Sequence, residues 1–365
     1  MRWRLRNARR CWQENRKIKG KPMKTRIMTE QAFATGGDGE AAALLDGGEV
    51  VAFPTETVYG LGASALDEKA VEKIFKAKGR PQDNPLIVHV SSREQAKRLA
   101  KVWTAAAEKL TQAFWPGPLT VIVEASDVIP KTVTAGLDTV GLRMPKGLVA
   151  QRLIELAGPI AAPSANVSGR PSPVTAMHVY QDMQGRIPLV IDGGRCEVGV
   201  ESTVVDATKQ TPVILRPGHI TKEQIAGCVG DCLVAGGVLQ PVTGRALSPG
   251  MLHKHYAPEG EAVLVSYTPG MTALACTLYD QAVAAGKKAV IIGRSAHAKG
   301  YGTRTFYPCD MDGSMAKGLF AMLRRADDEK MAYIILEGAD EQGEDLAYMN
   351  RALRAAGFHR LQAEE

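Results

Sequence analysis

Three basic side chains, Lys76, Lys78 and Arg80, lie within five residues at the point where a helical pattern ends. Residues 67–78 have their apolar side chains at helical spacing, with Asp67 placed to cap the start and Gly79 placed to end the helix. Cations in a last helical turn complement the helix dipole, so the cluster alone does not indicate a ligand. An anion site is indicated only if other segments bring further anion-binding groups to the same place.

Such groups recur next to the apolar runs that predict strands. Ligands of open α/β sheets bind beyond the strand ends, and there this chain places hydroxyls, an amide, glycines and cations. The segments are Pro54–Gly62, His89, Gly141–Pro145, Pro163–Ser172, Asp192–Gly194, Glu201–Thr203 and Arg216–Gly218. Any one of them is typical of an ordinary turn. Together they predict a site for a polyanionic ligand, because glycine and serine loops let backbone N–H groups approach phosphate oxygens and arginine supplies a bidentate fork.

Two blocks of alternating strands and helices must position these groups. The first block predicts strands at 49–53, 86–90, 119–123, 140–143, 159–162, 189–191, 202–205 and 213–216, and helices at 67–78, 93–114, 147–157 and 174–183. Its late strands follow one another closely, so some must pair antiparallel and the sheet should be mixed. The second block predicts strands at 262–266, 288–292 and 332–336 and helices at 271–285, 312–328 and 342–356.

The expected architecture is therefore α/β, with a twisted mixed sheet at 29–222 and a smaller Rossmann-like α/β domain at 261–365. Residues 223–260 are rich in glycine and proline and are predicted to form a linker. The second domain lacks G-x-G-x-x-G after its first strand, and the chain nowhere carries G-x-x-x-x-G-K-[ST]. Neither standard nucleotide fingerprint is present.

The net charge of +6 is concentrated at the start of the chain. Residues 1–28 hold 11 of the 45 basic residues and one acid, which leaves 34 basic and 38 acidic residues, a net charge of −4, in the remainder. This basic tail is expected to be disordered, and it fits a transit peptide without serine, a nucleic-acid arm, or sequence translated ahead of a start at Met23 or Met28. The third interpretation is favoured because ordered patterning begins near Gln31.

Cysteine usage and hydropathy indicate a cytoplasmic protein with reduced thiols and no membrane partner. The six cysteines are scattered without a C-x-x-C pair, and no apolar run approaches the roughly 20 residues that span a bilayer. His253 and His255 would share one face of an extended segment, but no cysteine or carboxylate cluster stands beside them. No metal site is predicted.

The motifs of this chain resemble those of a known family. Its motifs are similar, in order, to those of the YrdC-like family, the threonylcarbamoyl-AMP synthases, in the long two-domain form with a linker. They are Pro54–Gly62, Lys76–Pro81, Pro116–Thr120, Arg143–Pro145, Pro163–Gly169, Glu201–Thr203, Arg216–Gly218 and, in the linker, His253–Pro258. The resemblance covers residues 24–365 and leaves only the basic tail outside. It implies that 29–222 is the catalytic domain.

The resemblance implies that L-threonine, bicarbonate and ATP give threonylcarbamoyl-AMP and pyrophosphate, and that a separate tRNA threonylcarbamoyl transferase complex uses the product. Mg²⁺ is expected to arrive with ATP, bound mainly through the phosphates. By family position, Thr55, His89, Arg143 and Ser202 are assigned to threonine, with Arg143 pairing its carboxylate. Lys76 and Arg80 are assigned to catalysis at the ATP phosphates, and the remaining nucleotide contacts are Thr120, Ser164, Asn166, Ser172, Arg216 and Tyr256.

Lys78 is expected to face solvent, because it sits about 200° around the helix from Lys76. Arg80 and Ser164 are the most specific assignments, since the surrounding turns do not need them. His89 lies on an apolar strand, where a hydrogen-bonded structural histidine remains an alternative to a ligand contact. Tyr256 is expected to come from the linker and cover the nucleotide.

Two other functions remain open from the sequence. The first is a double-stranded RNA or tRNA binding protein without catalysis, or a synthase with weak RNA binding, because of the cationic tail. The charge of the body and its 20 aromatic residues argue against RNA binding as the main role. The second is a carbamoyl-transferring maturation enzyme with a YrdC-like domain, but the acylphosphatase-like segment and cysteine-rich zinc motifs expected of such enzymes are absent from this sequence.

Overall fold

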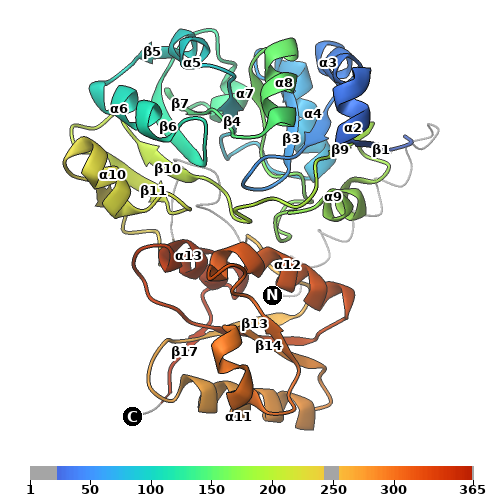
Figure 1. Cartoon of the computed structure of the whole chain (residues 1–365), viewed down its shortest axis with the longest axis vertical. Coiled ribbons are helices and arrows are strands. Elements are labelled where there is room, and N and C mark those ends of the chain that lie inside the picture. Colours follow the sequence, from blue (N-terminus) through green and yellow to red (C-terminus); the bar gives the residue numbers. More distant parts are fainter. Residues whose placement is uncertain (1–22, 242–254, 364–365) are drawn as a thin grey trace.

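The computed structural model describes residues 23–241 and 255–363 of the chain. They form two α/β domains, each built on its own sheet, with the second domain packed beneath the first (Figure 1). The expectation of a disordered tail at 1–22 lies outside the described residues. At 26–28 that expectation is wrong, because Arg26–Thr29 forms strand β1 and pairs in parallel with β9 (Leu189–Asp192).

The first domain contains a mixed sheet of twelve strands. Across the sheet the order is β1, β9, β2 (Val51–Phe53), β3 (Gly60–Ser64), β8 (Ile160–Ala161), β4 (Ile87–His89), β7 (Thr139–Arg143), β6 (Leu119–Ala125), β10 (Thr203–Asp206), β11 (Val213–Arg216) and β12 (Leu233–Val234), with β5 (Ala100–Val102) also paired to β6. The sheet contains both parallel pairs, such as β4 with β7, and antiparallel pairs, such as β6 with β7. The predicted mixed sheet is confirmed.

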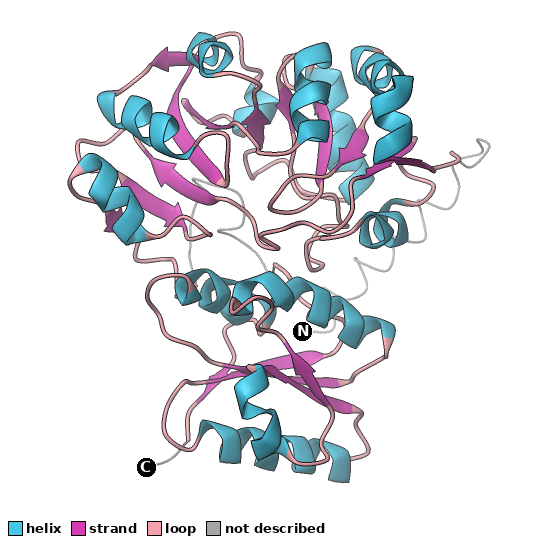
Figure 2. Ribbon diagram, viewed as in Figure 1, coloured by secondary structure: helices cyan, strands magenta, loops and turns pink. Residues whose placement is uncertain are grey.

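Helices of the first domain flank this sheet (Figure 2). They are α2 (Glu30–Ala32), a π-helical turn at Phe33–Gly37, α3 (Asp38–Asp46), α4 (Glu68–Lys78), α5 (Arg93–Leu99), α6 (Ala105–Phe114), α7 (Lys131–Thr134), α8 (Leu148–Ala157), α9 (Ala176–Met183) and α10 (Lys222–Val229). The boundaries of α4 follow the sequence signals: the Asp67 side chain accepts from two backbone N–H groups, and Gly79 ends the helix with φ 62°.

Two expectations about this part of the chain are wrong. The helix expected at 93–114 is broken, because β5 pairs with β6 and Thr104 then caps the start of α6, its hydroxyl accepting from Ala107 N at 3.1 Å. The linker expected at 223–260 begins with ordered elements, since α10 and β12 occupy its first part and β12 pairs with β11. Residues 242–254 of that linker lie outside the described residues.

The second domain is a parallel sheet of five strands with helices on both faces. The order is β15 (Phe306–Pro308), β14 (Ala289–Gly293), β16 (Tyr333–Glu337), β13 (Glu261–Val265) and β17 (Arg360–Leu361). Helices α12 (Met315–Asp328) and α13 (Asp345–Ala355) cover the face toward the first domain, and α11 (Met271–Ala284) covers the opposite face (Figure 1). A 3₁₀ segment, Ser295–Tyr301, follows β14. The sequence predicted the three central strands and missed the short β15 and β17.

The apolar core runs without a break from one domain into the other. One cluster joins Val88, Val121 and Val190 of the first sheet with Leu264 and Leu319 of the second domain. A separate cluster beneath α11 fills the far face of the second sheet. None of the helices in the described residues is long and apolar enough to cross a membrane. The two domains therefore meet through a packed apolar interface, on which the polar contacts described below are superimposed.

Candidate active site

A cleft of about 720 Å³, including its open mouth, lies at the ends of several strands of the first sheet. Lysine and arginine side chains enter it from five places: the end of α4, the turn after it, the end of β7, the loop after β8 and the end of β11. The residues lining it are Thr55, Thr57, Val58, Gly60, Lys78, Arg80, Ile87, His89, Arg143, Ala162, Pro163, Ser164, Asn166, Ser168, Gly169, Arg170, Glu201, Ser202, Arg216, His255 and Tyr256. Such a surface suits a polyanion.

The lysines of α4 are placed opposite to expectation. Lys78 is buried and lines the cleft, whereas Lys76 is exposed and does not. The reason is that Lys78 continues the buried stripe of Val71, Ile74 and Phe75, at spacings of seven, four and three residues. Burial and the nearby Arg80 guanidinium hold the pKa of Lys78 well below its ordinary value. The assignment of Lys76 to the cleft was therefore wrong, and Lys78 takes its place.

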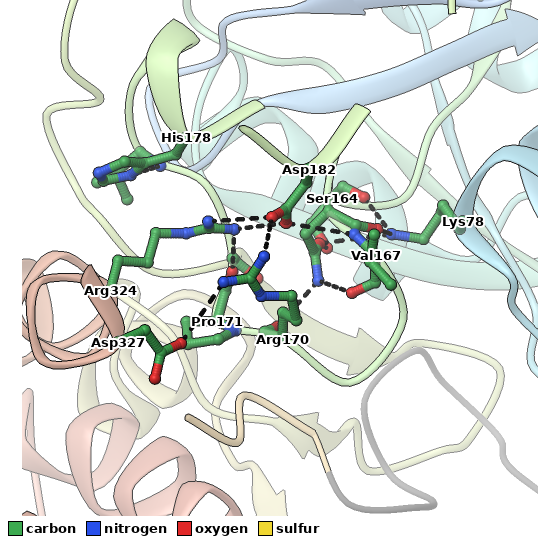
Figure 3. Close-up of polar contacts among 12 residues, drawn as sticks. Lys78, Ser164, Val167, Arg170, Pro171, His178, Asp182, Arg324 and Asp327 are labelled. Carbon is green, nitrogen blue, oxygen red and sulfur yellow. Dashed lines mark hydrogen bonds and ion pairs between the residues drawn. The ribbon is translucent and has the colours of Figure 1, made fainter. Parts of the chain in front are cut away.

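Lys78 organises the loop that follows β8. Its ammonium group donates to the backbone oxygens of Ser164 and of Asn166, the latter at 2.7 Å, and Figure 3 shows it directed at this loop. The Asn166 amide in turn donates to the oxygens of Val167 and Arg170, both at 2.9 Å. The Ser164 hydroxyl bonds to Asn166 Oδ1 at 2.5 Å. The loop is thus fixed by its own polar side chains, with Ser164 and Asn166 at the cleft wall.

Arg80 lies just beyond the helix end and faces the same cleft. Its Nη2 donates to the backbone oxygens of Asn84 and Pro85 at 3.1 and 3.2 Å, while its buried Nε has no hydrogen-bond partner among the described residues. Burial lowers the pKa of Arg80 to about 10, so the side chain remains a cation at neutral pH. A buried donor without a partner is costly, and a phosphate oxygen would satisfy it.

Arg143 and His89 end two neighbouring parallel strands and lie side by side in register. Arg143 Nη2 forms a buried ion pair with Glu56 Oε1 at 2.8 Å, and its Nε donates to the backbone oxygen of Gly117 at 3.4 Å. Burial and the adjacent Arg143 charge lower the pKa of His89 to about 3. His89 is therefore neutral in the cleft, and its Nδ1 has no hydrogen-bond partner among the described residues.

Thr55 reaches the same part of the cleft from the turn after β2. Its hydroxyl already donates to the backbone oxygen of Val58 at 2.6 Å and lies 2.8 Å from the Thr57 hydroxyl. The Thr55 side chain therefore shapes the turn as well as lining the cleft.

Ser202 and Arg216 form the opposite wall. Arg216 donates from Nε to the Ser202 backbone oxygen at 3.1 Å and from Nη2 to the Ser202 hydroxyl at 3.2 Å. The Thr120 hydroxyl lies 2.7 Å from that of Ser202, and the Ser172 hydroxyl donates to Glu201 at 2.5 Å. Thr120 and Ser172 are fully buried and do not line the cleft. They support the wall instead of forming its surface.

The end of the linker closes the cleft on the side of the second domain. The Tyr256 ring is buried and lies 5.0 Å, between centroids, from Phe320 of α12. His255 packs beside it, and burial, followed by the charge of Arg80, lowers the pKa of His255 to about 3. Its Nε2 has no hydrogen-bond partner among the described residues. Tyr256 thus lies in the cleft as expected, and His255 joins it.

Comparisons with known proteins cover both domains. The family model described as "Telomere recombination" matches residues 43–218, and the one described as "Threonylcarbamoyl-AMP synthase, C-terminal domain" matches residues 220–357. The threonylcarbamoyl-AMP synthase of Pyrococcus abyssi is 46% identical over 323 residues, which cover 87% of this chain and 93% of that protein. The Bacillus subtilis enzyme of the same name is 44% identical, with 87% and 92% covered.

The chain belongs to the threonylcarbamoyl-AMP synthase family. The structure agrees, since a crystal structure of Pyrococcus abyssi Sua5 complexed with L-threonine superimposes with a TM-score of 0.87 at 42% identity, over 93% of this chain and 99% of that one. The resemblance inferred from the motifs is confirmed, as is the two-domain form. All of these motifs except Pro116–Thr120 contribute lining residues to one cleft, which is a property of this structure and does not depend on the comparison.

Most of the residues assigned from sequence meet in the cleft of this family member. The structure brings together Thr55, Arg80, His89, Arg143, Ser164, Asn166, Ser202, Arg216 and Tyr256, and it leaves Lys76, Thr120 and Ser172 off the cleft surface. Sequence reasoning missed Lys78, Arg170, Glu201 and His255. The buried stripe of α4 could have indicated Lys78, and Glu201 lies beside an assigned residue. Arg170 lies in the predicted segment Pro163–Ser172 but was given no role.

The described residues contain no group of three or more histidine, cysteine, aspartate or glutamate side chains arranged to hold a metal ion. His253, one half of the histidine pair considered above, lies outside them. Glu201 lines the cleft and Glu56 lies beside Arg143, and each of these carboxylates forms an ion pair with an arginine.

Proposed function

We propose that this protein makes threonylcarbamoyl-AMP and pyrophosphate from L-threonine, bicarbonate and ATP, as a step in threonylcarbamoyl modification of tRNA. The proposal rests chiefly on the convergence of Lys78, Arg80, Arg143 and Arg216 on one cleft. This occurs in a chain whose relatives with that name match both of its domains. Two substrates, one with a carboxylate and one with a triphosphate, would use cations distributed in this way.

The reaction needs placement and charge stabilisation. The threonine amine attacks the carbon of bicarbonate and water is lost, which gives a carbamate. A carbamate oxygen then attacks the α-phosphorus of ATP, the bond from that phosphorus to the β-phosphate oxygen breaks, and pyrophosphate leaves. Because negative charge moves onto the pyrophosphate, fixed cations at its position lower the barrier without any protein nucleophile.

For the nucleotide, we propose that Arg80, Lys78 and Arg216 contact the phosphates. Ser164 and Asn166 would border them from the preformed loop, and Tyr256 would cover the nucleotide from the linker. The neighbouring hollow of about 600 Å³, which shares Arg80 and His255 with the cleft, offers room for the rest of ATP. Thr120 and Ser172 would act through their bonds to Ser202 and Glu201.

For threonine, we propose that Arg143 binds the carboxylate while it keeps its ion pair with Glu56, since a guanidinium has five donors. Neutral His89, Ser202 and Thr55 would contact the rest of the amino acid. A neutral imidazole suits a contact with an uncharged or acidic group, and its lowered pKa makes His89 a weak base at neutral pH.

Mg²⁺ is proposed to arrive with ATP. The chemistry of the cleft fits this, because its basic groups are aimed at an anion and Glu56 and Glu201 are each held by an arginine. A phosphate-bound ion that keeps several waters needs few protein ligands. It would supply additional neutralisation of the triphosphate.

The product is a reactive mixed anhydride, so we propose that a downstream tRNA threonylcarbamoyl transferase complex takes it up in the cytoplasm. Weak RNA binding remains a secondary proposal. Lys78, Arg143 and Arg216 are too deeply buried to reach the phosphates of an RNA duplex, which favours catalysis as their role.

The direct test is pyrophosphate release from ATP by the purified full-length chain with Mg²⁺. Release that requires both L-threonine and bicarbonate, and that L-serine supports much less, is the expected result. Release without threonine would indicate an ATP hydrolase instead. No release, combined with RNA binding that weakens steeply with salt, would indicate a nucleic-acid-binding protein without this catalytic activity.

A further inference from the structure

Two buried arginines of the second domain face the first. Arg324 lies on α12 and Arg351 on α13, the helices that cover the side toward the first domain, and they are 2% and 0% exposed (Figure 1). Burying a guanidinium group is costly unless its donors are paired. Both side chains are paired with carboxylates and carbonyl oxygens of the first domain: Arg351 with Glu201, which lines the cleft, and Arg324 with Asp182, which binds the loop after β8.

Arg351 fixes the wall that carries Ser202 and Arg216. Its Nε donates to Glu201 Oε2 at 3.1 Å, its Nη2 to the backbone oxygen of Glu201 at 3.3 Å, and its Nη1 to the backbone oxygen of Pro217. One side chain therefore holds the residue before Ser202 and the residue after Arg216. The second carboxylate oxygen of Glu201 accepts from Ser172, which extends the network to a third cleft segment.

Arg324 fixes the loop after β8 in a comparable way. Its Nη2 donates to Asp182 Oδ2 at 2.8 Å and to the backbone oxygen of Pro171 at 2.6 Å. Asp182 also accepts from Arg170 Nη1 at 2.7 Å and from Val167 N at 3.3 Å. Figure 3 shows Arg324 and Arg170 converging on the Asp182 carboxylate, beside the loop that Lys78 holds from the other side.

The two domains do not need these arginines in order to stay packed together. The apolar cluster already crosses the interface, and buried ion pairs often stabilise a protein no more than apolar side chains of similar volume. What the arginines add is geometry, because a planar fork fixes the direction of each partner. Arg351 also neutralises Glu201, whose charge would otherwise repel an anion in the cleft.

We propose that Arg324 and Arg351 are positioning residues of the nucleotide site, which hold from the second domain the two first-domain segments that receive ATP. The second domain is then a working part of the site as well as a support for the linker. The identity of the ligand rests on the proposed function, whereas the contacts themselves do not.

The decisive experiment measures Mg–ATP binding to the full-length chain by calorimetry. Arg351→Gln should weaken binding by at least about tenfold, because it leaves the Glu201 carboxylate buried without its main partner beside the phosphates. Adding Glu201→Gln should restore most of the affinity, since the glutamine oxygen can still accept from Ser172 but carries no charge. Arg360→Gln, which removes an exposed ion pair with Glu341 in the same domain, should bind ATP as the wild type does.

Arg324 has a matched control in the adjacent position. Arg325 is half exposed, pairs with Glu329 and lies over the Tyr307 ring, and both partners belong to the second domain. Arg324→Gln should weaken ATP binding severalfold, whereas Arg325→Gln should leave it unchanged.

The proposal fails for Arg351 if folded Arg351→Gln, checked by thermal unfolding, binds ATP like the wild type. It also fails if Glu201→Gln restores no affinity in the double variant. If Arg351→Gln does not fold, Arg351→Lys keeps the charge without the fork and should show intermediate affinity, and wild-type affinity in that variant would equally overturn the proposal. ATP binding without pyrophosphate release would refute the proposed reaction while still testing the positioning role. A wild-type chain that binds no ATP would overturn both.

Discussion

Both domains have a group of polar side chains at the carboxyl ends of their strands, but the two groups differ in whether their hydrogen-bonding atoms find partners within the protein. In the second domain, the buried Glu337 carboxylate accepts from the Tyr301 hydroxyl and from the Arg294 backbone N–H at 2.8 Å, and lies 3.0 Å from His297 Nδ1. Gly293 leaves no room for a ligand beside it, since even a Cβ at that position would collide with Glu337. The Glu337 carboxylate therefore has its partners within the second domain.

In the cleft of the first domain, by contrast, buried polar atoms stay without hydrogen-bond partners. Among the described residues these include Arg80 Nε, His89 Nδ1 and His255 Nε2, and all three side chains border the same hollow. Because a buried unpaired polar group costs free energy, such atoms persist where a ligand supplies the partner. The difference teaches that strand-end location alone does not indicate a site. Several unsatisfied donors and acceptors that border one hollow do, whereas isolated ones such as Thr132 Oγ1 and Thr268 Oγ1 do not.

The largest effect should come from removing a cleft cation. Arg80→Ala should lower kcat/KM for ATP by about two orders of magnitude or more, since it removes a charge-assisted fork from a water-poor cleft. The steady-state rate of pyrophosphate release measures this. Lys76→Ala, on the exposed side of the same helix, is the matched control and should leave the rate unchanged. Equal losses in the two variants would mean that the cleft is not the phosphate site.

The next largest effect tests the closed cluster of the second domain. Glu337→Gln should lower the free energy of unfolding by about 1–3 kcal/mol, because the buried network loses its charged acceptor. KM for ATP and for threonine should stay at the wild-type values, since no cleft residue contacts this cluster. Urea unfolding and pyrophosphate release on the same preparation separate the two quantities. A changed KM with unchanged stability would break the contrast between the domains.

Local patterns predicted most of this arrangement, and the failures have physical causes. Strand ends and turns indicated the segments that hold most of the cleft residues, because those signals depend only on neighbouring sequence, whereas the individual assignments, Tyr256 in the linker among them, came from the family resemblance. The angle between Lys76 and Lys78 alone predicts that Lys78 faces solvent. The buried stripe at Val71 and Ile74 fixes which face of the helix is covered, and Lys78 lies on that face. The local sequence predicts a helix at 100–104, but pairing with β6 overrides that local preference.

Other features could not be predicted from any window of sequence. Arg351 and Glu201 are 150 residues apart, and Arg324 and Asp182 are 142 apart. Each arginine lies in an amphipathic helical pattern in which an exposed position would be equally ordinary. Only the packing of α12 and α13 against the first domain shows that these charges are buried and paired.

A smaller effect is expected at the linker. Tyr256→Leu keeps an apolar side chain against Phe320 but loses the aromatic face, and ATP affinity should fall by about tenfold. Tyr267→Leu, at a tyrosine 58% exposed in the second domain, is the control and should bind ATP normally. Calorimetric titration with Mg–ATP gives both values. If Tyr256→Leu retains full affinity, the linker is a tether and takes no part in covering the nucleotide.

The last effect concerns pH, and it follows from the two histidines that each have one ring nitrogen without a partner. Burial lowers the pKa values of His89 and His255 to about 3, whereas an unfolded histidine has a pKa of about 6.5. Between these values the unfolded chain binds more protons, so stability rises with pH. This contribution is complete above about pH 6.5 and is lost as the pH falls toward 3, by up to about 1.4 kcal/mol per pH unit for each histidine.

Urea unfolding between about pH 7 and 5 tests this, because the wild type should lose stability faster than His89→Gln as the pH falls. His219→Gln, at an exposed histidine of the same domain, is the control and should follow the wild type. Parallel curves for the wild type and His89→Gln would show that His89 is not held neutral by the fold. Bound Mg–ATP and threonine should reduce the difference between the curves if they supply the partner that His89 Nδ1 lacks, which makes the same titration a test of where the substrates lie.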